Sequence, residues 1–208
     1  MLTRDKVIEW LYEVGNVMAE NKEFLTKLDA EIGDADHGIN MDRGFKKVLE
    51  QLSALKNSDI GNILKNTGLA LISSVGGASG PLYGTLFIRA GTKASGKNEL
   101  HISELVAVLQ DGLNGVIDRG RANYGDKTMV DALLPGIEAL RKASEKGKPQ
   151  REALMQAVMA AEQGVKATIS MQARKGRASY LGERSIGHQD PGATSSYLIL
   201  KALQDVLS

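Results

Sequence analysis

Residues 28–40 read Leu-Asp-Ala-Glu-Ile-Gly-Asp-Ala-Asp-His-Gly-Ile-Asn, a polar turn between two segments whose apolar residues follow helical spacing. It places Asp29, Asp34 and Asp36 within eight residues, with two glycines that let the backbone bend between them. Carboxylates this close repel one another unless a cation lies among them, and Mg²⁺ prefers a few carboxylates completed by water and phosphate oxygens. The stretch predicts a Mg²⁺-phosphate site. The alternative is a solvated acidic loop in which an aspartate caps the next helix.

Several other classes of protein are excluded. Counted from Asp34, the sixth and twelfth positions are Ile39 and Phe45, where an EF-hand needs Gly and Glu. The chain has no cysteine, so disulfides, thiolate metal sites and cysteine nucleophiles are absent. With 26 Lys and Arg against 25 Asp and Glu, the net charge of +1 predicts no nucleic-acid partner and no acidic membrane surface. Without a signal peptide or membrane span, the expected location is cytoplasmic.

The 208 residues predict one domain over 1–208, and its expected class is all-α. Apolar residues recur at helical spacing, and no stretch shows the period-2 alternation of a strand. The expected helices are Arg4–Ala19, Lys22–Glu31, Asn40–Leu55, one from Ser58 or Asp59 to Ser74, Ser79–Ala90, Ser103–Arg119, Thr128–Lys146, Pro149–Gln172 and Pro191–Leu207. Because most connections are short, we expect antiparallel neighbours in an up-and-down bundle or a closed helical barrel.

Three predicted helix starts carry groups suited to anions. The stretch 73–84, Ser-Ser-Val-Gly-Gly-Ala-Ser-Gly-Pro-Leu-Tyr-Gly, lets backbone N–H groups approach a phosphate at the N-terminus of the following helix. It is no P-loop, because no Gly-Lys-Ser/Thr closes it; tight helix packing is the alternative explanation. Residues 125–128 (Gly-Asp-Lys-Thr) offer a hydroxyl, an ammonium and free N–H groups, and residues 190–194 (Asp-Pro-Gly-Ala-Thr) offer a capping carboxylate and an exposed helix start.

A basic segment precedes the last helix. Residues Ala173–Asp190, here named the lid, form a connection too long for an ordinary loop, and residues 173–184 hold four cations: Arg174, Lys175, Arg177 and Arg184. Arginine binds phosphate through its bidentate fork, so the lid is expected to clamp phosphate. The alternative is a solvated basic loop. What favours the clamp is that an acidic turn, three glycine-rich helix starts and a basic lid occur in one helical chain, as a nucleotide with Mg²⁺ requires.

Two histidines and one tryptophan leave further alternatives open. His37 and His188 are candidates for a phosphorylated residue, although a hydrogen-bonding loop histidine is commoner. Trp10, inside the first predicted helix, is interpreted as a core residue in preference to a ligand contact.

Four segments in order resemble the L subunits of dihydroxyacetone kinases, the DhaL family. They are Leu-Asp-x-Glu-Ile-Gly-Asp-Ala-Asp-His-Gly (28–38), Ser-Ser-Val-Gly-Gly-Ala-Ser-Gly-Pro (73–81), Gly-Asp-Lys-Thr-Met (125–129) and residues 173–193. The resemblance runs from about Ile8 to Leu203. It implies an eight-helix antiparallel up-and-down closed barrel with a nucleotide site at one rim, in which Lys22–Glu31 is a minor helix or part of the first connection.

The resemblance also implies the site. Asp29, Asp34 and Asp36 would hold two Mg²⁺ ions. The residues implied around the adenine nucleotide are His37, Gly38, Ile39, Asn40, Ala78, Ser79, Gly120, Thr128, Met129, Arg177, Asp190, Pro191 and Gly192. No catalytic side chain is implied, because phosphoryl transfer asks chiefly for positioning and electrostatic stabilisation.

The implied activity is that of a phosphotransferase subunit. ADP stays bound as a coenzyme, a phosphohistidine on the M subunit of a phosphoenolpyruvate-driven phosphotransferase system converts it transiently to ATP, and the γ-phosphoryl passes to dihydroxyacetone on the K subunit. The length of 208 residues favours this stand-alone subunit over an autonomous ketose kinase that exchanges ATP. A second role as a nucleotide-loaded module that binds a transcription regulator stays open.

Overall fold

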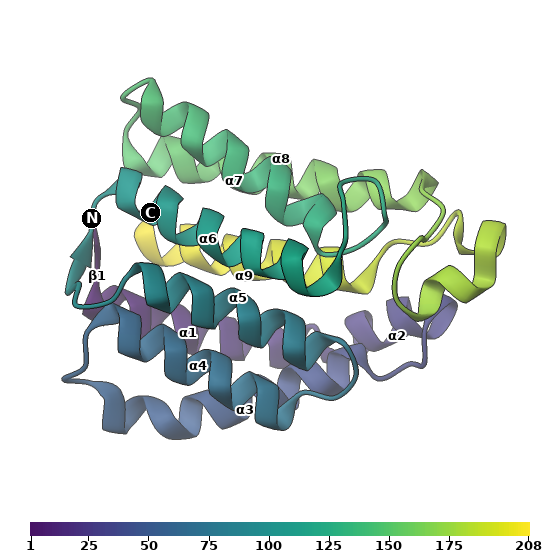
Figure 1. Ribbon diagram of the computed structural model, residues 1–208, viewed down its shortest axis with the longest axis horizontal. Coiled ribbons are helices and arrows are strands. Elements are labelled where there is room, and N and C mark those ends of the chain that lie inside the picture. The colour runs from purple at the N-terminus through teal and green to yellow at the C-terminus, as the bar shows by residue number, and fades with distance from the viewer.

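The computed structural model describes residues 1–208, and it is all-helical apart from two very short strands (Figure 1). The α-helices are α1 (Arg4–Glu20), α2 (Lys22–Ile32), α3 (His37–Leu52), α4 (Ile60–Ser74), α5 (Ser79–Lys93), α6 (Ile102–Gly120), α7 (Val130–Glu145), α8 (Gln150–Ala167) and α9 (Pro191–Leu207). Short 3-10 helices are η1 (Ser53–Leu55), η2 (Thr168–Ser170) and η3 (Arg177–Ser185). No helix has both the length and the apolar composition needed to cross a membrane.

The expected all-α class is confirmed, and the differences lie at element ends. β1 (Leu2–Thr3) pairs antiparallel with β2 (Glu99–Leu100), a contact that two residues of pattern could not reveal. The predicted start of α6 at Ser103 is wrong, because His101 is the cap and its N–H donates to the Glu104 carboxylate. The predicted end of α8 at Gln172 is also wrong, since the chain tightens into η2 after residue 167.

Successive helices pack side by side around the molecule. The contacting pairs are α1 with α3, α3 with α4, α4 with α5, α5 with α6, α6 with α7, α7 with α8, α8 with α9, and α9 with α1. The short α2 departs from this sequence: it contacts α3, α9 and η3 at one end of the molecule (Figure 1). The interior between the helices holds one large apolar core. Trp10 belongs to it, 4% exposed, with its ring nitrogen donating to the Ile199 carbonyl at 3.0 Å, so its interpretation as a core residue is confirmed.

Neighbouring helices run in opposite directions, so alternate helices begin at the same end of the molecule. Helices α3, α5, α7 and α9 all begin at the end that carries α2 and η3, which we call the site end (Figure 1). Both chain termini lie at the opposite end, as Figure 1 shows. The connections at the site end include the segments between α6 and α7 and between α8 and α9, the second of which contains the lid.

Helices α4 and α5 approach closely at glycines. A Cβ added to Gly68 would lie 2.5 Å from the Gly84 carbonyl oxygen and 2.9 Å from the Ile88 backbone nitrogen, and a Cβ on Gly84 would meet the Gly68 carbonyl oxygen at 2.9 Å. Because these neighbours are backbone atoms, no side-chain rotation relieves the clash. The glycines therefore set the distance between the two helices that bound the 75–78 turn.

We predict that Gly68→Ala destabilises the fold. Alanine gains about 1 kcal/mol of helix propensity over glycine, whereas overpacking a helix interface costs about 1–3 kcal/mol. The melting temperature, measured by circular dichroism, should therefore fall by up to roughly 8 °C for a chain of this size. Leu69→Ala, at a side chain 57% exposed on the next position of α4, is the matched control and should change it little. A Gly68→Ala variant as stable as the wild type would show that the helices separate freely.

Candidate functional site

A cavity of about 480 Å³ opens at the site end, among the starts of α3, α5, α7 and α9 and the lid. The predicted site residues that line it are Asp29, Asp34, Asp36, His37, Ala78, Ser79, Gly120, Thr128, Met129, Arg177, Asp190, Pro191 and Gly192. One wall is apolar, with Leu82, Val116 and Met129 among its residues. The three aspartates form the acidic part of the lining, here named the acidic wall. A ligand with one flat apolar part and one anionic part matches these two walls.

The three aspartates converge. One carboxylate oxygen from each of Asp29, Asp34 and Asp36 lies within 4.8 Å of the others. Asp29 extends from α2, and its Oδ2 accepts hydrogen bonds from the backbone N–H groups of Asp36 (2.9 Å) and His37 (3.1 Å). It thereby fixes the turn that carries the other two. Asp36 stands at the N-cap position of α3, yet its side chain makes no capping hydrogen bond.

The chemistry of this donor set fits Mg²⁺. Three carboxylates from one short segment supply only hard oxygen ligands, and a Mg²⁺ ion uses about one or two of these with water or phosphate oxygens. The capping alternative accounts for Asp29 but not for Asp34 or Asp36. Close approach of the backbone supports the same geometry: a Cβ on Gly33 would overlap the Asp29 carboxylate, and Ala35 adopts a left-handed φ of +60° that directs the turn back to α2.

His37 lies under the aspartates as a neutral hydrogen-bonding residue. Its Nε2 is 2.8 Å from the Ser195 hydroxyl and its Nδ1 is 3.2 Å from the Ser79 hydroxyl. Burial lowers the pKa of His37 to about 4, although the charges of Asp29 and Asp36 act in the opposite direction. The Tyr83 hydroxyl extends the network, at 2.6 Å from Ser195 Oγ and 2.9 Å from Ser196 Oγ. Both ring nitrogens of His37 are thus occupied by hydroxyl groups. His188 is partly exposed beside Glu31.

Two acidic side chains shape the helix starts on the other side of the cavity. Asp131 accepts from the N–H groups of Gly125 and Thr128 and folds the loop before α7 onto itself. Asp190 caps α9 by accepting from the Ala193 N–H at 2.7 Å. The pKa of Asp190 is raised to about 7, chiefly by burial; the charges of Asp131 and Asp29 act in the same direction, whereas the Ala193 N–H and Lys127 act against it.

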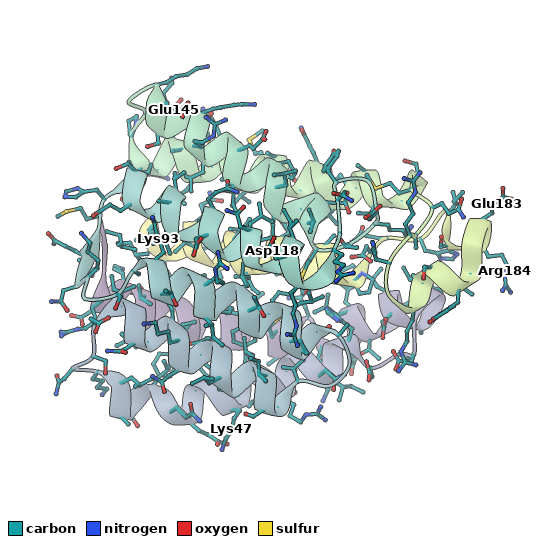
Figure 2. The ribbon with its side chains drawn as sticks, viewed as in Figure 1. Lys47, Lys93, Asp118, Glu145, Glu183 and Arg184 are labelled. Atoms are coloured by element: carbon teal, nitrogen blue, oxygen red, sulfur yellow. The ribbon has the colours of Figure 1, made fainter.

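Only part of the lid faces the cavity. Lys175 and Arg177 line it, and the Arg177 guanidinium donates to Asp34 Oδ2 at 3.0 Å, at the acidic wall. Arg174 and Arg184 do not line it, and Figure 2 shows Arg184 and Glu183 on the outer part of the lid, away from the helices. The expected four-cation clamp therefore reduces to two residues.

The structure separates three predicted residues from the cavity. Gly38, Ile39 and Asn40 belong to the first turn of α3 and do not line it. Gly38 packs so tightly on α2 that an added Cβ would overlap the Lys22 carbonyl, Ile39 is 44% exposed, and Asn40 accepts from Arg43 at 2.6 Å. Their part in ligand binding stays a prediction.

Sequence reasoning missed Tyr83, Arg119 and Asp131, of which the first two line the cavity. Asp131 had a signal, since Thr-x-x-Asp at a helix start is a capping pattern. Tyr83 had none, because its partners lie more than one hundred residues away. Lys127 was expected to offer its ammonium to a phosphate. Its side chain instead is 1% exposed and donates to backbone carbonyls.

Comparisons with known proteins agree with this geometry. The family described as the DAK2 domain matches residues 31–205. The ADP-binding subunit DhaL of the phosphoenolpyruvate-dependent dihydroxyacetone kinase of Escherichia coli strain K12 is 54% identical over 202 residues, which are 97% of this chain and 96% of that subunit. The ADP-binding subunit DhaL of dihydroxyacetone kinase 2 of Listeria innocua is 43% identical over 95% of this chain and 92% of its own length.

A solved structure gives the same fold. The dihydroxyacetone kinase of C. freundii in complex with AMP-PNP and Mg²⁺ superimposes with a TM-score of 0.74 at 27% identity, over 96% of this chain. This chain spans about a third of that kinase, 33% of its length.

The fold and the cavity define an all-helical domain whose ligand site is built at the starts of alternate helices and carries a cluster of carboxylates. The chain belongs to the DAK2 domain family, and its matched residues include all but the first members of the acidic turn.

Removal of the acidic ligands should abolish stabilisation by metal and nucleotide. A ligand present at a thousand times its dissociation constant stabilises the fold by about 4 kcal/mol. We expect Mg²⁺ with ADP to raise the melting temperature of the wild type, and to leave that of Asp34→Asn or Asp36→Asn nearly unchanged. Glu138→Gln, an exposed carboxylate on α7, is the control. If EDTA and both substitutions left the effect of ADP intact, these aspartates would be solvated surface charges.

Arg177→Lys should weaken the site although the charge is kept. A lysine cannot reproduce the planar fork with which arginine binds a carboxylate or phosphate. We expect faster release of bound ADP with unchanged helicity, measured by chasing labelled ADP with unlabelled nucleotide. Arg184→Lys, on the outer lid, is the matched control. Equal ADP release from Arg177→Lys and the wild type would make Arg177 a surface charge.

Proposed function

We propose that this chain is the ADP-binding, phosphoryl-transferring subunit of a phosphoenolpyruvate-dependent dihydroxyacetone kinase. In this proposal Mg-ADP is a resident coenzyme, which a phosphohistidine on an M subunit phosphorylates to ATP and which returns to ADP when its γ-phosphoryl passes to dihydroxyacetone on a K subunit. The single observation that carries it is the convergence of Asp29, Asp34 and Asp36 on one wall of a cavity built from helix starts. Identity of 54% to an ADP-binding subunit, against 27% to the C. freundii kinase, supports the subunit over the autonomous kinase.

The residues have separate parts in this proposal. Asp29, Asp34 and Asp36 hold two Mg²⁺ ions, which when bound offset the charge of the phosphates. Arg177 and Lys175 approach the same anionic end from the lid. The N–H groups at the starts of α5 and α9, with Ala78, Ser79, Pro191 and Gly192, face the phosphate chain. Gly120, Thr128 and Met129, beside the apolar wall, surround the base.

The chain itself contributes positioning and charge. His37 is neutral and fully hydrogen-bonded, so it orients the Ser79 hydroxyl and does not exchange a proton with the ligand near pH 7. No side chain is placed as a nucleophile, which agrees with the small covalent demand of phosphoryl transfer. The apolar wall excludes water from one side of the cavity, and hydrolysis of a transferring phosphoryl group competes less in such a site.

The architecture we infer is one domain over residues 1–208, a closed barrel of eight antiparallel helices. Each of α1 and α3–α9 packs against the next, and α9 packs against α1, which supports closure. The additional α2 holds Asp29 at the rim. A barrel of this kind leaves the site end open to the K and M subunits in turn.

The coenzyme hypothesis predicts that the chain does not turn over alone. With labelled ATP and dihydroxyacetone but no partner, we expect negligible labelled dihydroxyacetone phosphate. Addition of a K subunit should allow about one transfer per preloaded nucleotide, because each transfer leaves ADP in a site that releases it slowly. Sustained turnover should require an M subunit and its phosphoenolpyruvate-driven relay. Many turnovers per chain without a partner would identify an autonomous kinase instead.

A further inference from the structure

Lys127 is a buried cation whose ammonium binds only backbone carbonyls of the protein, so a direct contact with a nucleotide does not account for it. Its ammonium donates to the carbonyl oxygens of Thr168 (2.7 Å), Met171 (3.1 Å), Ser185 (2.8 Å) and His188. The residue is 1% exposed, and no carboxylate forms a salt bridge with it. An ammonium has three protons, so four carbonyls share them and none of its donors remains for a phosphate.

The four carbonyls lie on the two chain segments that meet at the base of the lid, one just before residue 173 and one in the last part of the lid. Thr168 and Met171 lie where the chain leaves α8, and Ser185 and His188 lie where it returns to α9. Other hydrogen bonds join the same two strands of chain: Ala173 N–H donates to Ser185 Oγ at 2.9 Å, and Gly187 N–H donates to the Ile169 carbonyl at 2.7 Å. The Lys127 ammonium is the only charged group among these hydrogen bonds, and it lies between the two segments.

The backbone of Lys127 has an uncommon conformation, which turns the side chain toward these carbonyls. Its φ is +62°, in the left-handed region that a non-glycine residue adopts only at a cost. Lys127 and the next two residues, Thr128 and Met129, line the cavity, although the Lys127 ammonium is turned to the backbone carbonyls. The Arg174 N–H, at the start of the lid, donates to the carbonyl of the preceding Asp126 at 3.1 Å. One short loop thus contacts both the ligand cavity and the base of the lid.

We propose that Lys127 is a positioning residue for phosphate recognition: its ammonium fixes both ends of the lid and so sets where Arg177 and Lys175 meet the anionic part of the ligand. The assignment rests on the proposed function for the identity of that ligand. Lys127 acts at a distance, since Arg177 lies beside Asp34 at the acidic wall while the ammonium lies among the lid's backbone carbonyls. Loss of its charge removes the donor that four carbonyls share, two of them in buried hydrogen bonds, and the lid ends then separate.

The test compares Lys127→Met, which keeps the length of the side chain and removes the charge, with the wild type. Trypsin cleaves after Lys and Arg, and the lid offers it Arg174, Lys175, Arg177 and Arg184. On nucleotide-free protein we expect lid cleavage about tenfold faster or more in the variant, with helicity preserved. In competition binding, affinity for ADP should fall by a larger factor than affinity for adenosine, because the lid meets phosphates and not the base.

A destabilised control separates positioning from loss of fold. Leu140→Ala removes a core side chain, 1% exposed, from the part of α7 far from the cavity. At a comparable fall in melting temperature it should leave lid cleavage and the ratio of ADP to adenosine affinity at wild-type values. If Lys127→Met does not fold, Lys127→Gln, which keeps two N–H donors on a shorter chain, is measured in its place.

Three results would overturn the proposal: lid cleavage of the Lys127 variant at the wild-type rate, the same acceleration in Leu140→Ala, or equal weakening of ADP and adenosine. Failure of the proposed function is recognised separately. If the wild type binds neither ADP nor ATP, that function is wrong, whereas the cleavage comparison on nucleotide-free protein still decides whether Lys127 holds the lid.

Discussion

Mutual repulsion among Asp29, Asp34 and Asp36 is the constraint on which the site end depends. With oxygens within 4.8 Å, each pair of unit charges repels by about 3 kcal/mol at an effective dielectric constant near 20. Positive groups of the chain offset part of this repulsion: the N–H groups at the start of α3 bind Asp29, and Arg177 pairs with Asp34. Asp36 has no such partner bond. On the proposed function, a bound cation would relieve the remaining repulsion.

Arg177 and Lys127, the two cations that contact the acidic wall and the base of the lid, differ in their exposure to solvent. Arg177 is largely exposed and reaches the acidic wall from a 3-10 helix that few contacts hold, so its position depends on the backbone that carries it. Lys127 is buried and binds that backbone at both ends. On the proposed function, a buried anchor at the base of the lid and an exposed fork on its surface suit a site that retains its nucleotide and admits partner proteins.

The sequence predicted what depends on local pattern and missed what depends on distant contact. Helical spacing located the helices from Arg4 to Leu207, and the glycine-rich turns and aspartates located most of the cavity lining. The prediction that the Lys127 ammonium faces a phosphate was wrong. Its acceptors are backbone carbonyls 41 to 61 residues away, and a backbone carbonyl is the same in every residue type. The hydrogen bonds of Tyr83 could not be predicted for the same reason, because nothing in the sequence distinguishes Ser195 and Ser196 from other small polar residues of a packed helix.

The placement of the site follows from helix direction. In an array of antiparallel neighbours alternate helices begin at the same end, so α3, α5, α7 and α9 present their unsatisfied N–H groups and positive dipole ends to one cavity. Each of these starts is polar in sequence, and the Asp190 carboxylate already consumes one N–H of α9. The three aspartates come from the end of α2 and the turn after it, and Asp29 binds the first N–H groups of α3. On the proposed function, α2 thus adds carboxylates for a cation beside helix starts that face the phosphates.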